Sequence, residues 1–131
     1  MSALKCIVVT PEATALEQAA DHVVLPLYDG EIGIYRGHSP LVGRLGYGQM
    51  RLSVGGQVRR YYVDGGFVQV VDDVVSVLTS KAVAADKIDV DAARRQLQDA
   101  RARRINTPEL LDIRDRLIAQ ARAQIRVAGQ A

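Results

Sequence analysis

The sequence predicts an all-β N-terminal sandwich of about ten short antiparallel strands, followed by a C-terminal antiparallel two-helix hairpin. Three observations lead to this prediction. The length of 131 residues suits one domain with an appendage. Ten of the eleven glycines and all six aromatic residues lie before Ala85. From residue 86 onward the chain is rich in alanine, arginine, leucine and glutamine, which favour helices. We therefore assign residues 1–85 to the sandwich and residues 86–131 to the hairpin.

Short β-branched runs separated by turn signals predict the strands of the sandwich. The clearest runs are residues 23–27, 32–34, 50–54, 58–63, 67–71 and 74–79. Tight turns are expected at Gly55-Gly56 and Asp72-Asp73, and a further turn at Asp64-Gly65-Gly66. The last two strands are almost continuously apolar. We therefore expect a second sheet on one of their faces and another covering element on the other.

Cap signals predict where the two helices begin. Asp89 suits an N-cap, and the first helix should run to about Arg104. The segment 106–109, Asn-Thr-Pro-Glu, combines a cap with a proline at the first helical position and starts the second helix. The expected apolar faces are Val90, Ala93, Leu97 and Ala100 on the first helix and Leu110, Ile113, Leu117, Ala121 and Ile125 on the second. These alanine-rich faces bury few large side chains, so docked and undocked states of the hairpin should lie close in energy.

Composition excludes several classes of protein. The formal net charge is only +2, with the positive excess in residues 86–131, which does not indicate a strongly basic nucleic-acid binder. The apolar runs are too short for a membrane helix, and the N-terminus lacks a signal-peptide pattern, so the chain should stay in the compartment where it is made. The single cysteine, Cys6, excludes an internal disulfide and is expected to be an inert packed thiol.

The sequence carries no motif for catalysis or metal binding. His22 and His38 have no carboxylate or cysteine partners at metal-ligand spacing, and no nucleophile motif or phosphate-binding glycine loop is present. We expect no catalytic residue, no metal and no cofactor. His38, between Gly37 and Ser39, is interpreted as a turn residue hydrogen-bonded to the backbone.

Four stretches carry a resemblance to a known family. They are "GEIGIYRGHSPLVGRL" at 30–45, "GQMRL" at 48–52, "YYVDGGFVQVVDDVVSVLTSKAV" at 61–83 and "KIDVDAA" at 87–93. Together they resemble the epsilon subunit of the bacterial F-type rotary ATP synthase over essentially the whole chain. The most specific element is the G-E-I-G-I-Y-x-G-H-x-P-L block, reinforced by the D-G-G-F that opens a strand. The family fold, a ten-stranded sandwich followed by two helices, agrees with the prediction above.

The resemblance implies a coupling role with no catalysis of its own. Epsilon subunits bind the gamma subunit and the polar loops of the c-ring, and so pass rotation of the ring to the shaft. By position, the Asp29–His38 segment would meet the ring and the shaft, with Glu31, Arg36 and His38 as contact residues. The chain would then be a peripheral protein at the cytoplasmic face of the bacterial membrane, in contact with the membrane only through the complex.

The resemblance also implies a regulatory hairpin. In the family, the folded hairpin permits turnover, whereas the extended hairpin enters the alpha/beta catalytic hexamer and blocks ATP hydrolysis through basic side chains that face an acidic segment of the beta subunit. The candidate contacts here are Arg114, Arg116, Arg122 and Arg126. A merely solvated helix face is the alternative interpretation of these arginines.

Two positions depart from the family pattern. Arg36 replaces a proline found in many relatives, which leaves the stiffness of that loop open. Some relatives bind ATP through an I/L-D-x-x-R-A motif, and here Ala92 stands at the position of its arginine. Asp89, Arg94 and Arg95 are the residues left for a weak nucleotide contact.

A stand-alone sandwich that binds nucleic acid or sugar, with a helical oligomerisation arm, is the alternative function. Against it stands the slightly acidic balance of residues 1–85. Such a module also needs basic residues interleaved with stacking aromatics, and Tyr61-Tyr62 beside Arg59-Arg60 is the only such cluster. We therefore expect the gamma subunit, the c-ring and the catalytic hexamer as partners, and no nucleic acid.

Overall fold

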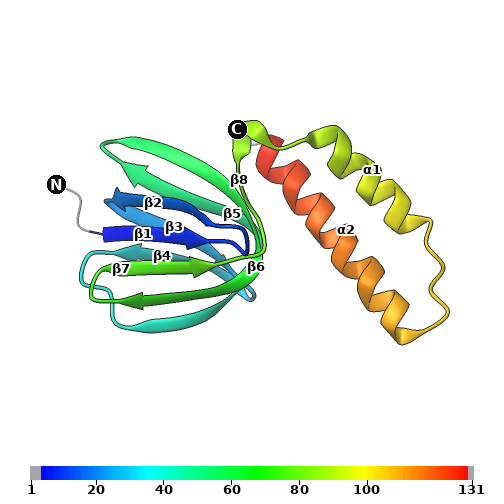
Figure 1. The fold of residues 1–131 in the computed structure, drawn as a ribbon, viewed down its shortest axis with the longest axis horizontal. Helices are drawn as coiled ribbons and strands as arrows, with labels where there is room; N and C mark the ends of the chain where they lie inside the picture. Colours follow the sequence, from blue (N-terminus) through cyan, green and yellow to red (C-terminus); the bar gives the residue numbers. More distant parts are fainter. Residues whose placement is uncertain (1–3, 130–131) are drawn as a thin grey trace.

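A β-sandwich and a helical hairpin lie side by side in the structure, a computed structural model that describes residues 4–129 (Figure 1). The strands are β1 (Leu4–Val9), β2 (Thr14–Ala20), β3 (His22–Leu27), β4 (Gly30–Tyr35), β5 (Leu41–Val54), β6 (Gln57–Val71), β7 (Val74–Leu78) and β8 (Ala82–Ala84). The helical part comprises the 3-10 turn η1 (Ala85–Lys87) and the helices α1 (Val90–Arg101) and α2 (Pro108–Gly129). The predicted order of sandwich and hairpin is confirmed.

The strands form one sheet that folds back on itself around a single core. Their order is β2-β1-β7-β6-β5-β3-β4, with β8 paired to the first half of β6. All pairings in the described residues are antiparallel except that of β1 with β7, which is parallel and was not expected. The described residues contain eight strands rather than about ten, because β5 and β6 are 14 and 15 residues long and each contributes to both layers.

A bend in β6 replaces the turn that was predicted at Asp64-Gly65-Gly66. The strand continues through these residues, pairing with β8 before them and with β7 after them. Before the bend the odd-numbered residue Val63 faces the core, and after the bend the even-numbered residues Val68 and Val70 face it. The strand therefore turns its opposite face to the core at the bend. The prediction was wrong because the same glycine pair serves a bend inside a strand as well as a turn between two strands.

Gly66 is the position at which the bend requires glycine. Its φ is +105°, and a Cβ atom placed there would lie 1.8 Å from the carbonyl oxygen of Leu78. No side chain fits at that distance without displacing the β7 backbone. The other predicted turns are confirmed: Gly55-Gly56 and Asp72-Asp73 both have positive φ at their two residues, as tight antiparallel hairpins require.

The core lies between the two layers and uses residues of the sandwich alone. Its fully buried members include Cys6, Val23, Leu25, Met50 and Val77. Burial raises the pKa of the Cys6 thiol to about 12, so the inert thiol expected from the sequence is confirmed. Strand β2 was missed by the sequence prediction because three of the seven residues of its segment, TALEQAA, are alanine and only Thr14 is β-branched.

The caps predicted for both helices are present. The Asp89 carboxylate accepts a hydrogen bond of 2.9 Å from the Ala92 amide, and the Thr107 hydroxyl accepts one of 3.1 Å from the Leu110 amide. The first helix ends at Arg101, three residues earlier than expected. The helices pack as the expected antiparallel pair, and the Gln96 side chain donates a 2.9 Å hydrogen bond to the Leu117 carbonyl (Figure 1).

Candidate functional site

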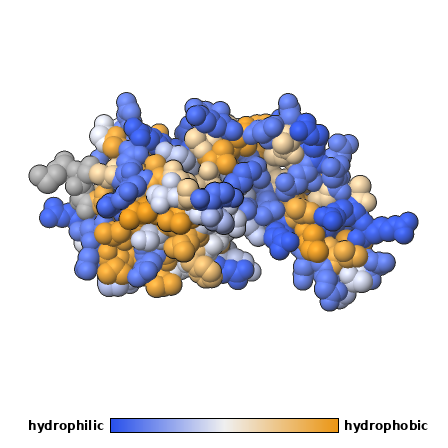
Figure 2. Space-filling model, in the orientation of Figure 1, coloured by the Kyte–Doolittle hydropathy of each residue, from blue (hydrophilic) through white to orange (hydrophobic). Residues whose placement is uncertain are grey.

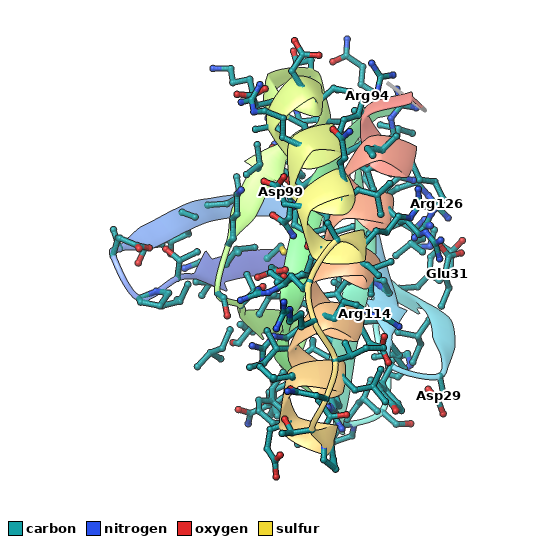
Figure 3. The ribbon with its side chains drawn as sticks, turned by 90° about the vertical axis from the view of Figure 1, so that its right-hand side faces the viewer. Asp29, Glu31, Arg94, Asp99, Arg114 and Arg126 are labelled. Atoms are coloured by element: carbon teal, nitrogen blue, oxygen red, sulfur yellow. The ribbon has the colours of Figure 1, made fainter. Side chains whose placement is uncertain are left out.

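The Asp29–His38 segment forms the tip of the β3–β4 hairpin, strand β4 and the turn that follows it. Glu31 is exposed on β4, and its Oε2 atom accepts a 3.2 Å ion-pair hydrogen bond from Arg51 of β5. Figure 3 shows Asp29 and Glu31 on this hairpin, at the edge of the molecule. Glu31 and the hairpin tip are therefore accessible to solvent, whereas Ile34 of the same strand is buried in the core.

Hydrogen bonds hold the turn after β4. The Gly37 amide donates to the Asp73 carboxylate at 2.7 Å, and His38 Nδ1 donates to the Ser39 carbonyl at 2.7 Å. The second bond confirms the interpretation of His38 as a turn residue bonded to the backbone. Arg36 is exposed, and the turn around it is held from the β6–β7 turn by Asp73. This loop is thus braced although Arg36, unlike a proline, does not itself restrict the backbone.

The four candidate arginines of α2 do not share one face. Arg122 and Arg126 are exposed and lie four residues apart, so they are neighbours on the helix surface. Arg114 is half-buried, 3.6 Å from Asp115, and its Nε atom is buried with no partner among the described residues. Arg116 instead lines a cleft between α2 and the sandwich. Figure 3 shows Arg114 part-way along α2 and Arg126 near its C-terminal end.

A hollow beside the start of α1 lies at the position of the nucleotide motif. It has a volume of about 210 Å³, and its lining includes Asp89 and Ala92. The cations at this hollow are Lys81 and Lys87, whereas Arg94 and Arg95 do not line it. The Asp89 carboxylate is engaged as the cap of α1. Both arginines are exposed on α1.

The hairpin is docked on the sandwich through the C-terminal half of α2. Ala123 and Val127 are buried against Tyr62 of β6 and Ala85 of η1. The carboxylate of Asp64 accepts a 2.5 Å hydrogen bond from the Tyr62 hydroxyl and a 3.3 Å hydrogen bond from the Gln120 amide. Sequence analysis missed this contact. The larger residues of the expected α2 face, among them Leu110 and Ile113, are only partly buried.

Tyr62 is fully buried in the docked arrangement. Burial, the hydrogen bond to Asp64 and the negative charge of Asp64 raise the pKa of Tyr62 far above its ordinary value of 10.0. A hydrogen bond from Gln124 of α2 acts in the opposite direction. Tyr62 is therefore harder to deprotonate in the docked state than in water, and undocking would return its hydroxyl to water.

A cleft of about 840 Å³ separates the earlier part of α2 from the sandwich. Its lining includes Tyr28 and Arg44 on the sandwich side and Arg116 and Gln120 on the helix side. The Arg44 guanidinium lies 4.5 Å from the centre of the Tyr28 ring. Because this cleft is open, α2 meets the sandwich mainly near its C-terminal end.

An exposed apolar face covers the outer side of β1, β7, β6 and β5. Its members are Val9, Val42, Phe67, Val71 and Leu78, with exposed fractions between 37% and 75%. Val9 pairs with Leu78, and Leu78 with Phe67, so these side chains form a row across three strands. Figure 2 shows an apolar patch on this side of the sandwich.

The sequence contained a signal for this apolar face. The nearly continuous apolar strands 67–71 and 74–79 predicted a second covering element, and within the described residues no helix takes that place. The helical hairpin packs elsewhere, against β5, β6 and η1. Monomeric proteins seldom expose contiguous apolar patches without a partner, so this face is a candidate protein interface.

The basic-aromatic cluster considered for nucleic acid does not form a stacking surface. Tyr62 is buried under α2, and Tyr61 packs against the sandwich core. Arg59 donates a 2.9 Å hydrogen bond to Gln18 of β2. Stacking of bases needs exposed aromatic faces, which this cluster does not offer.

The part of the chain that the structure describes contains no group of three or more histidine, cysteine, aspartate or glutamate residues that could hold a metal ion. Across residues 4–129, none of the helices is long and apolar enough to cross a membrane.

Comparison with known families gives a match over most of the chain. Residues 3–85 match the family model described as ATP synthase, Delta/Epsilon chain, beta-sandwich domain. An ATP synthase epsilon chain from Rhodopirellula baltica is 48% identical over 125 residues, which cover 95% of this chain and 98% of that protein. An ATP synthase epsilon chain from Desulfitobacterium hafniense (strain Y51) is 38% identical over 120 residues, covering 92% and 90% respectively.

Solved structures share the fold at lower sequence identity. A chain of the Euglena gracilis mitochondrial ATP synthase, in a structure of OSCP/F1/c-ring, aligns with a TM-score of 0.84 and 21% identity, covering all of this chain and 83% of that one. A chain of the Tetrahymena thermophila mitochondrial ATP synthase central stalk/c-ring aligns with a TM-score of 0.75 and 12% identity, covering 96% of both. Sandwich and helical hairpin thus recur together in these chains.

Proposed function

The chain belongs to the ATP synthase epsilon-chain family, and on this premise we propose that it couples rotation of the c-ring to the gamma shaft as a non-catalytic subunit of the central stalk. Its partners are the gamma subunit, the c-ring and the alpha/beta catalytic hexamer. The observation that carries the proposal is the exposed apolar face of the sandwich, which this chain's own hairpin leaves uncovered. A nucleic-acid or sugar module is not favoured.

The apolar face is the proposed seat of the gamma subunit. Its row of valine, phenylalanine and leucine side chains spans three neighbouring strands of a rigid sheet. The Lys5–Glu17 ion pair, at 2.8 Å on β1 and β2, supplies polar groups beside the row. An apolar centre with a polar rim is typical of stable subunit interfaces.

Replacing Phe67 with glutamate is expected to remove copurification with the gamma subunit. The change places a charge in the centre of the apolar face, where burial against a partner leaves it unpaired and costs about 2 kcal/mol or more. The matched control is Val58→Glu, because Val58 is exposed to a similar extent, 55% against 59% for Phe67, at the start of β6. Pull-down of gamma with the tagged chain measures the effect. Equal recovery of gamma with both variants would contradict this interface, and recovery of nucleic acid instead of gamma would contradict the function.

The Asp29–His38 segment is the proposed contact with the c-ring. Glu31 and Arg36 present opposite charges at an exposed edge, and the turn at His38 is braced by hydrogen bonds to the backbone and to Asp73. A braced polar edge suits transmission of torque, because it loses little conformational entropy when it docks. We place the chain, by this contact, at the cytoplasmic face of the bacterial membrane as a peripheral subunit.

The helical hairpin is proposed to inhibit ATP hydrolysis when it leaves the sandwich and extends toward the catalytic hexamer. Arg122 and Arg126 form a cationic pair on one face of α2, suited to an acidic segment of the beta subunit. Arg114 is half-buried in the docked arrangement, whereas Arg116 is exposed there although it lines the cleft. The docked hairpin described above is then the non-inhibiting state.

ATP is expected to bind this chain only weakly. The hollow at Asp89 and Ala92 measures about 210 Å³, below the roughly 300 Å³ at which ligand pockets usually begin, and the motif arginine is absent. Any residual contact would use Lys81 and Lys87 rather than Arg94 and Arg95, which lie outside the hollow. Isothermal calorimetry with millimolar ATP should show little heat of binding. Micromolar affinity would contradict this expectation, and an Ala92→Arg variant that gains affinity would support it.

A further inference from the structure

The surface on which the hairpin docks is polar as well as apolar. Tyr47 and Gln49 of β5 pair with Asp64 and Tyr62 of β6, so these four side chains lie on one face of the sheet, toward α2. The core-facing neighbours on the same strands, such as Met50, are apolar. The face of the sheet toward α2 therefore carries polar side chains, whereas its opposite face, toward the core, carries apolar ones.

Asp64 is the centre of this surface. Its two carboxylate oxygens accept hydrogen bonds from one donor in the sandwich, Tyr62, and one in the hairpin, Gln120. Its own amide is held by the Thr79 hydroxyl at 2.9 Å and by the Lys81 carbonyl at 3.1 Å, which fixes the carboxylate at the bend of β6. Gln120, Ala123 and Val127 are spaced three and four residues apart on α2, so a single face of that helix reaches both Asp64 and Tyr62.

We propose that Tyr62, Asp64 and Gln120 form a hydrogen-bonded latch that sets the balance between the docked and the extended hairpin. The inference rests on the proposed inhibitory role of the extended hairpin. Asp64 is the positioning residue of the latch, because its hydrogen bond with Gln120 fixes where α2 lies on the sandwich. When the hairpin undocks, water can donate to the Asp64 carboxylate in place of Gln120, so undocking costs little free energy.

The rest of the interface between the hairpin and the sandwich buries few large side chains of α2. Its apolar part on α2 consists of Ala123 and Val127. The open cleft leaves the earlier part of α2 without apolar support. In addition, the Oε1 atom of Gln49 is buried without a hydrogen-bond partner among the described residues, which disfavours the docked state. The geometry is that of a reversible contact rather than of a second core.

The test uses Gln120→Glu, which turns a hydrogen bond to Asp64 into a repulsion between two carboxylates. The matched control is Gln98→Glu, the same chemical change at an exposed position of α1. Both are made in an Ala123→Cys background, because residue 123 is buried only while the hairpin is docked. Cys6 stays silent toward alkylating reagents because it is buried in the core and its thiol has a raised pKa.

Gln120→Glu is expected to increase the alkylation rate of the cysteine at position 123 about tenfold or more, the scale of losing one contact in a coupled polar network. Gln98→Glu should leave the rate unchanged. Adding Asp64→Asn to Gln120→Glu should restore slow alkylation, since the new amide donates to the new carboxylate. In chains without the added cysteine, NMR signals of the Tyr62 ring should move toward exposed values in Gln120→Glu alone. Equal alkylation rates in all four chains, with an unmoved Tyr62 ring, would overturn the latch.

Hydrolysis assays separate failure of the latch from failure of the proposed function. With reconstituted catalytic core, Gln120→Glu should inhibit hydrolysis more strongly than the unchanged chain, because more hairpins are extended. A faster alkylation rate without any change in hydrolysis would contradict the inhibitory role and leave the latch supported. Unchanged alkylation, together with normal inhibition that depends on the hairpin, would contradict the latch alone.

Discussion

A chain that ends at Lys87 is expected to fold, to bind the gamma subunit and to lose its inhibition of ATP hydrolysis. The core cluster draws only on residues of strands β1 to β8, so removal of α1 and α2 leaves it complete. The end at Lys87 keeps β8 and η1, which pack on β6. The apolar face also remains, since the hairpin does not cover it.

Hydrolysis by the catalytic core should then be severalfold faster with the truncated chain than with the full chain. The measurement is the steady ATPase rate under conditions where both chains are shown to be bound. Replacing Arg122 and Arg126 together with alanine should raise the hydrolysis rate part of the way, because each exposed ion pair between an arginine and an acidic residue contributes only about 0.2–1 kcal/mol. Equal hydrolysis with full and truncated chains would contradict the regulatory role. Loss of assembly on truncation would show instead that the hairpin is structural.

The Gly66→Ala variant is expected to lose most of its stability. A Cβ atom at this position meets the Leu78 carbonyl oxygen at 1.8 Å, and a φ of +105° is strained for any residue with a side chain. Relief requires β7 to move away from β6 along the bend. We expect a loss of about 4 kcal/mol or more in the free energy of unfolding, a large part of the about 5–15 kcal/mol typical of a domain.

Gly56→Ala is the matched control for this prediction. Gly56 also has positive φ, +82°, but a Cβ atom there has no neighbour within 4 Å. Its substitution should cost only the backbone strain, about 1–2 kcal/mol. Denaturant unfolding followed by circular dichroism gives both values. Losses of the same size in the two variants would show that the close approach of β7 to Gly66 is not the reason why this position requires glycine.

The two parts of the fold were predictable because their local signals agree with their tertiary contacts. Glycine turns at positions 55–56 and 72–73 and the caps at Asp89 and Thr107 satisfy local backbone requirements, which a sequence states directly. The bend at Gly66 was misread because its glycine serves a contact with β7, twelve residues further along the chain. Sequence pattern does not show which neighbour a glycine approaches.

The interaction surfaces were less predictable than the fold. Asp64 looked like a turn residue, and its role arises only because the bend places it opposite Gln120 of α2. The docking face of α2 escaped notice because Ala123 and Val127 are smaller than the leucines and isoleucines of the expected face. For the apolar face, the sequence predicted only that a further element covers the second side of strands 67–71 and 74–79. An apolar run indicates that a strand is buried but does not indicate what buries it.

The contact proposed for Glu31 can be examined with a single substitution. Glu31→Trp adds bulk at the exposed edge, where Glu31 now pairs with Arg51 at 3.2 Å. Gln57→Trp, at the exposed start of β6, is its control. Both variants leave the apolar face unchanged, so both should still bind the gamma subunit.

ATP-driven proton pumping by ATP synthase membranes depleted of their own epsilon chain is the most direct test of the coupling role. The unchanged chain and Gln57→Trp should restore pumping, whereas Glu31→Trp should bind and restore it only in part. Failure of the bound, unchanged chain to restore pumping would contradict the account.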